Sequence, residues 1–64
     1  MKTGKVKFFF ESKGYGFITD TKTNESIFVH INHLTEPVKE RDKVFFETER
    51  TPKGMSAINV KKVQ

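Results

Sequence analysis

Two short segments carry aromatic side chains at the spacing of a β-strand, and they are the residues best suited to hold a ligand. Residues 13–18 (KGYGFI) alternate glycine with aromatic residues, and residues 27–31 (IFVHI) alternate aliphatic residues with rings. Side chains two apart on a strand share a face at roughly 7 Å, a spacing on which successive nucleic-acid bases can stack. If the two strands pair antiparallel, four rings become neighbours: Tyr15, Phe17, Phe28 and His30.

The charges around these rings favour a polyanionic ligand. The chain has a formal net charge of +4 and a pI near 9.6. We expect Lys5, Lys7 and Lys13 to form a basic rim, with Lys53 and Lys61 as further candidates, that follows the phosphates of a single strand. We therefore predict single-stranded RNA or DNA as the partner.

Other kinds of chemistry find little support in the sequence. The chain has no cysteine, and its two histidines, His30 and His33, have no second cluster of ligands that would indicate a metal site. No Ser/His/Asp order and no glycine-rich loop opening a helix is present, and a chain of 64 residues leaves little room for a substrate cleft. We expect neither catalysis, nor a cofactor, nor a small-molecule substrate.

The elements that must position the rings are short strands. Apolar alternation and β-branched or aromatic content predict strands over residues 4–10, 15–20, 26–31, 43–50 and 55–63. Turns are expected at 21–25 and 51–54, and one helical turn at 32–34 before Pro37. Because five short strands gain most by closing on themselves, we predict an all-β fold, a small five-stranded antiparallel barrel of the OB type.

Period-2 alternation separates core from surface. It places Lys7, Tyr15, Phe17, Phe28 and His30 on the outside. Phe45 and Phe46 are expected to pack within the fold rather than contact a ligand. Eight aromatic residues in a chain that is 34% hydrophobic also predict that several rings lie on the surface. The predicted interior residues are Val6, Ile18, Ile27, Val29, Val44, Phe46, Ile58 and Val60.

The run Phe8-Phe9-Phe10 is ambiguous. Strict alternation from Val6 would bury Phe8 and Phe10 and expose Phe9. A β-bulge or a strong bend would reverse this pattern. Phe10 is left open between edge packing and ligand contact.

The sequence resembles the bacterial cold-shock domain family. Residues 4–9 (GKVKFF), 13–18 (KGYGFI) and 27–30 (IFVH) are similar to its first strand and its two ribonucleoprotein motifs, in order and spacing. The resemblance covers residues 1–64 as one domain. It implies an OB-fold protein of the cytoplasm that binds single-stranded nucleic acid with little sequence selectivity, as an RNA chaperone or a regulator of transcription or translation.

The resemblance also implies which residues contact the ligand. Three departures predict a somewhat reduced site: Phe8 stands where the family usually has Trp, Phe10 where Asn is usual, and Ile31 where an aromatic is common. The loop 36–41 is also shorter and lacks the family's aromatic residue. The implied contacts are Lys7, Phe8, Phe9, Lys13, Tyr15, Phe17, Phe28 and His30.

Two other functions remain open alongside this one. A small β-barrel with surface aromatics could dock a protein partner, and an OB-fold factor could bind structured ribosomal RNA. No apolar run approaches the length of a membrane span, and the first residues lack the hydrophobic stretch of a secretory signal. We expect a soluble monomer in the cytoplasm with no membrane partner.

Overall fold

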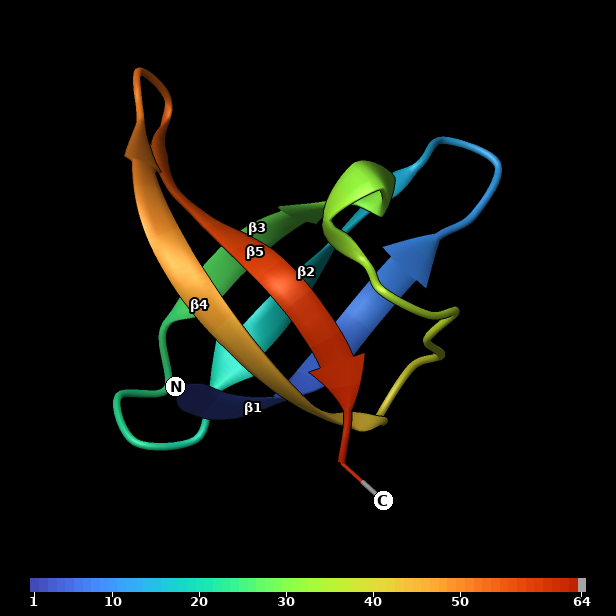
Figure 1. The fold of residues 1–64 in the computed structure, drawn as a ribbon, viewed down its shortest axis with the longest axis horizontal. Coiled ribbons are helices and arrows are strands. Elements are labelled where there is room, and N and C mark those ends of the chain that lie inside the picture. The colour runs from blue at the N-terminus through green and yellow to red at the C-terminus, as the bar shows by residue number, and fades with distance from the viewer. Residues whose placement is uncertain (64) are drawn as a thin grey trace.

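The fold is a closed β-barrel whose strands follow the order β1-β2-β3-β5-β4, with β4 returning to β1 (Figure 1). Neighbouring strands run antiparallel except β3 and β5, which pair in parallel. The predicted all-β, five-stranded barrel is confirmed, with that parallel contact as an addition. The computed structural model describes residues 1–63, which form β1 (Lys2–Phe10), β2 (Tyr15–Asp20), β3 (Ser26–His30), a 3-10 helix η1 (Ile31–His33), β4 (Lys43–Thr51) and β5 (Gly54–Lys62).

The third strand ends earlier than predicted. The Nδ1 atom of His30 accepts a hydrogen bond from the backbone N–H of Asn32 at 3.1 Å, which caps η1 directly after β3. The predicted helical turn therefore begins at Ile31 rather than Asn32. Ile31, the last residue of the predicted strand, lies in this turn instead and is 43% exposed.

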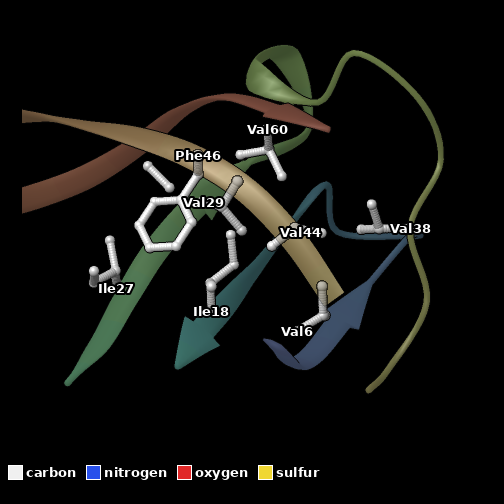
Figure 2. Close-up of a cluster of buried hydrophobic side chains, with 9 residues drawn as sticks. Val6, Ile18, Ile27, Val29, Val38, Val44, Phe46 and Val60 are labelled. Carbon is white, nitrogen blue, oxygen red and sulfur yellow. The ribbon is translucent and has the colours of Figure 1, made fainter. Parts of the chain in front are cut away.

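The barrel interior is a compact aliphatic cluster around one ring. Phe46 is fully buried and lies among valine and isoleucine side chains from all five strands (Figure 2). Seven of the eight predicted interior residues are buried. The buried hydrophobic residues are Val6, Ile18, Ile27, Val29, Val38, Val44, Phe46, Ala57 and Val60.

Ile58 is the exception, and the pairing of β4 with β5 explains it. The register shifts between Phe45 and Glu47, so that Ile58 pairs with the exposed Glu47. Asn59 has a positive φ of 51° at this irregularity. Because the bulge reverses the alternation, Ala57 points inward in place of the half-buried Ile58.

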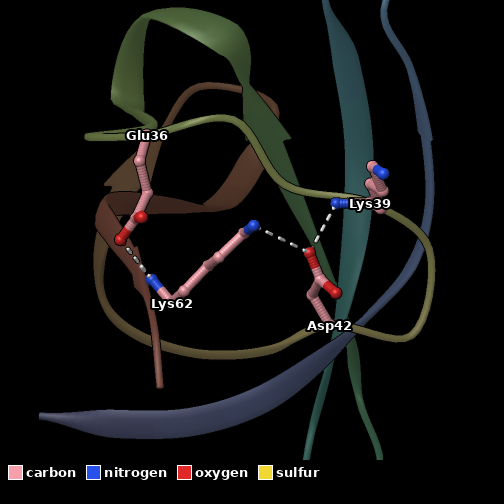
Figure 3. Close-up of polar contacts among 4 residues, drawn as sticks. All are labelled: Glu36, Lys39, Asp42 and Lys62. Carbon is pink, nitrogen blue, oxygen red and sulfur yellow. Dashed lines mark hydrogen bonds and ion pairs between the residues drawn. The ribbon is translucent and has the colours of Figure 1, made fainter. Parts of the chain in front are cut away.

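The loop between η1 and β4 closes one end of the barrel and is tied to β5. Val38 is buried in the core, which the strand pattern did not predict. Figure 3 shows the polar contacts that hold the loop: a Glu36 carboxylate oxygen accepts from the backbone N–H of Lys62 at 3.0 Å. Asp42 accepts from the backbone N–H of Lys39 at 2.8 Å and lies 3.8 Å from the Lys62 ammonium.

A bulge in β1 reverses the direction of the side chains in the Phe8-Phe9-Phe10 run. Val6 pairs with Ile18 and Phe8 with Phe17, with the register shifting across Lys7. Because Lys7 is the extra residue, Val6 points into the core while Phe8 and Phe10 point outward. Phe9 turns inward and packs, half-buried, against the core.

Gly16 allows β1 to approach β2 at this bulge. A Cβ atom at this position would lie 2.6 Å from Cδ1 and 2.8 Å from Cα of Phe9, and closer still to the carbonyl oxygen of Phe8. Both neighbours include backbone atoms, which cannot simply rotate away. The glycine between the two rings of β2 is therefore required by contact with the adjacent strand.

We expect Gly16→Ala to lower the free energy of unfolding by about 1–3 kcal/mol, because the added methyl group must displace β1. Urea unfolding followed by circular dichroism measures this change. Ser12→Ala, in the exposed turn between β1 and β2, serves as the control and should stay within about 0.5 kcal/mol of the parent protein. Equal stability of the Gly16→Ala and parent proteins would contradict the close approach.

Candidate nucleic-acid interface

Strand pairing arranges the aromatic residues of β1, β2 and β3 in two rows across one face of the barrel. Phe8 pairs with Phe17, and Phe17 pairs with Phe28. Two residues along, Phe10 pairs with Tyr15, and Tyr15 pairs with His30. We call the side-chain surface made by these two rows the aromatic face; it consists of Phe8, Phe10, Tyr15, Phe17, Phe28 and His30.

The rings of this face touch one another. Tyr15 and Phe28 are stacked, with centroids 5.8 Å apart and planes inclined by 23°. Phe17 lies 5.3 Å from Phe8 and 5.8 Å from Phe28, while Phe10 lies 4.9 Å from Phe8. These distances fall within the range of favourable aromatic pairs. Five rings from three strands therefore form one continuous surface.

The rings are held in place yet accessible. Phe10 is 43% exposed and Phe28 is 37% exposed. Tyr15, Phe17 and Phe8 are half-buried between them, so Phe17 is less exposed than we expected. Beneath the face, the inward residues of the same strands, Ile18, Ile27 and Val29, fill the core. The face is a set of apolar surfaces on a rigid support.

His30 lies at the end of the second row and differs from the other members. It is exposed and pairs with Tyr15, and no close ring pair joins it to the five other aromatic side chains of the face. Its Nδ1 atom is engaged with the backbone of Asn32. This bond fixes the plane of the imidazole and leaves Nε2 free to donate.

Phe9 and Phe10 exchange the places that simple alternation gives them. Phe9, implied as a contact by the family resemblance, lies off the aromatic face and lines a separate apolar pocket with Ile31, Leu34 and Pro37. Phe10, left open in the sequence, joins the face beside Phe8 and Tyr15. Both positions follow from the bulge at Lys7. The sequence was compatible with a bulge in this strand but did not show at which residue it lies.

Three lysines lie near members of the aromatic face. The ammonium of Lys13 lies 5.7 Å from the centroid of the Phe10 ring, a cation–π distance. Lys7 is exposed at the bulge next to Phe8. Lys53 lines a pocket with Phe17, Phe28 and His30. Lys61 pairs with Phe45 on the β4–β5 side and lines none of the pockets that hold these rings.

The same pocket extends the face onto the β4–β5 hairpin. Its lining includes Met55, which is 48% exposed, together with Thr51 and Ser56. Ser56 pairs with Phe28, so β5 continues the first aromatic row as a fourth strand. Met55 was not singled out in the sequence, since an isolated methionine after a turn carries no periodic signal.

Other ligand chemistry is weakly represented. Within residues 1–63, histidine, aspartate and glutamate side chains do not gather in groups of three that could hold a metal ion. None of the helical structure in this range is long and apolar enough to span a membrane.

Comparison with known proteins agrees with this geometry. Residues 2–63 match the family model of the "Cold-shock" DNA-binding domain. The major cold shock protein of Micrococcus luteus is 40% identical over 67 residues, which cover 98% of this chain and all of that protein. The cold shock-like protein CspG of Shewanella violacea is 44% identical over 62 residues, covering 91% of this chain and 89% of the relative.

A solved structure shows the same fold. The drosophila Unr CSD456 structure superposes with a TM-score of 0.81 over 98% of this chain at 20% sequence identity. The chain spans about a quarter of that longer protein, 26% of its length. The match of the family model over nearly the whole sequence, together with full-length relatives at 40% identity, shows that this chain belongs to the cold-shock domain family of nucleic-acid-binding OB-fold proteins.

Proposed function

We propose that the protein binds single-stranded RNA or DNA, with bases stacked on the aromatic face and phosphates held by the lysines at its border. The observation that carries this proposal is the continuous surface of five rings from three adjacent strands. The proposed contacts are Lys7, Phe8, Phe10, Lys13, Tyr15, Phe17, Phe28 and His30, with Lys53 at the hairpin.

The arrangement favours an unpaired strand over a duplex. In a duplex the flat faces of the bases are covered by their neighbours, so a row of rings has nothing to stack on. In a flexible strand the bases can splay onto rings whose centroids lie 4.9–6.5 Å apart. Each stacked base contributes about 1–3 kcal/mol and does so for any base, because every base has a π-face.

The charge distribution supports the same ligand. A lysine ammonium is a compact point charge that suits contacts to phosphates, and phosphate contacts carry no sequence information. The acidic residues Glu47 and Glu49 lie on β4, which contributes no ring to the aromatic face. Neither carboxylate lines a pocket that contains rings of the aromatic face.

We extend the proposal to an RNA chaperone or a regulator of transcription or translation, which acts as a single-domain monomer in the cytoplasm and has no catalytic activity. A protein that binds only the unpaired form shifts a hairpin towards the open state by mass action. Support for this role comes from the family membership and from the preference for unpaired strands argued above.

A titration of fluorescent heptathymidine against a duplex of the same length tests the function. We expect micromolar or tighter binding of the single strand in low salt, and much weaker binding of the duplex, because its bases are not available for stacking. No binding of the single strand at micromolar protein would favour a protein-docking module. Preference for a folded RNA would favour a factor for structured RNA.

Phe28→Ala should weaken heptathymidine binding tenfold or more, since it removes an exposed stacking surface from the first row. The free energy of unfolding should fall by only about 1 kcal/mol or less, because the ring is not part of the core. Phe45→Ala is the matched control: it removes a half-buried ring on β4 and should leave affinity unchanged. A stability loss of about 3–5 kcal/mol for Phe28→Ala would instead place that ring in the core.

Salt dependence should be moderate. If Lys7, Lys13 and Lys53 each contact a phosphate, a slope of about 0.7 per contact for single strands predicts a roughly 20-fold loss of affinity between 50 and 200 mM salt. Fluorescence titrations at four salt concentrations give the slope. A slope several times steeper would mean that phosphate contacts rather than stacking dominate binding.

A further inference from the structure

The surface that carries the two aromatic rows continues into a third, polar row. Lys5 pairs with Thr19, and Thr19 pairs with Ser26, on the same three strands and the same outward side as the rings. Lys5 and Thr19 also line a cleft in this part of the molecule. We call it the basic cleft; its other lining residues include Lys7, Thr21, Asn24 and Arg41.

Arg41 reaches this cleft from the loop that precedes β4. Its backbone N–H donates to the carbonyl oxygen of Val6 at 2.7 Å, and the N–H of Val6 donates to the carbonyl oxygen of Asp42 at 2.9 Å. The ties of Glu36 and Asp42 to Lys62 hold the same loop from the other side (Figure 3). Arg41 is thus fixed beside the bulge residue Lys7.

The backbone of Arg41 adopts a conformation that is unfavourable for its side chain. Its φ is 74°, in the left-handed region where glycine is the favoured residue. The fold would therefore accept glycine here at lower cost. A strained position occupied by a charged residue at the edge of a candidate site suggests a role for that charge.

The charges of the cleft are not neutralised within the protein. The ion pair found among residues 1–63 joins Lys62 to Asp42, so Lys5, Lys7 and Arg41 have no carboxylate partner in this part of the chain. Glu40 is the single carboxylate that lines the cleft, against these three cations. The lining contains no aromatic ring but includes two threonine hydroxyls, which suits phosphates better than bases.

We propose that the basic cleft binds the sugar-phosphate backbone of nucleotides that extend beyond the aromatic face. The bound strand then has two parts: one segment whose bases stack on the rings, and an adjoining segment held by its phosphates alone through Lys5 and Arg41. The proposal rests on the function proposed above, and it predicts that the binding site is longer than the ring surface.

An oligonucleotide with an abasic tail separates the two parts. Heptathymidine is compared with heptathymidine that carries five abasic phosphodiester units at its 5′ or its 3′ end. Because the tail offers phosphates without bases, it should raise affinity at 50 mM salt when attached at one of the two ends. With two added phosphate contacts, the affinity for the tailed strand should fall about sevenfold more than the affinity for heptathymidine between 50 and 200 mM salt.

Variants assign this gain to the cleft. Lys5→Gln/Arg41→Gln should bind the tailed and untailed strands equally well, whatever its affinity for heptathymidine itself. Arg50→Gln/Lys61→Gln is the control, since it removes the same charge from exposed positions that line neither the cleft nor the pockets of the aromatic face. This control should retain the gain from the tail.

Arg41→Gly provides a second and independent readout. It should keep or raise the melting temperature, because glycine relieves the positive φ, while it reduces the gain from the tail. The proposal is overturned if neither tail raises affinity, or if Lys5→Gln/Arg41→Gln retains the full gain. Failure of heptathymidine itself to bind the parent protein would overturn the stacking function and this extension together.

Discussion

The pairing of β1 with β2 across the bulge at Lys7 is the constraint on which the binding surface depends. The bulge lets Val6 point into the core and Phe8 point outward, although the two are separated by a single residue. Gly16 permits it, because any larger residue would collide with the backbone of Phe8 and Phe9. Without this register, Phe8 and Phe10 would turn away from Phe17 and Tyr15, and β1 would present Phe9 as its single outward ring.

A barrel this small has to divide its aromatic residues between stability and binding. Phe46 alone fills the centre of the core, and the remaining interior positions are aliphatic or alanine. The rings on β1, β2 and β3 stay at the surface, where they stabilise one another through edge and stacked contacts. Their mutual contacts hold them in fixed positions, so less conformational entropy is lost when bases stack on them.

The electrostatics of the molecule follow the same division. Lys7, Lys13 and Lys53 border the rings, and Lys5 and Arg41 carry the positive charge beyond them along β1. The carboxylates of Glu36 and Asp42 are used to fasten the loop to β5. These two carboxylates serve the fold, while Lys5, Lys7 and Arg41 have no carboxylate partner among residues 1–63 and are available to a ligand.

The sequence by itself determined the strands, the core and the central rings, because the alternation of apolar residues within a strand can be recognised from neighbouring residues alone. Tyr15, Phe17, Phe28 and His30 lie together on one face as their spacing predicted. The tertiary structure alone placed Phe9 inward and Phe10 outward, turned Ile58 from the core, buried Val38 and brought Arg41 beside Lys7. Each of these placements depends on a bulge or on a loop packed against a distant strand. Such features produce no periodic pattern of apolar residues from which they could be predicted.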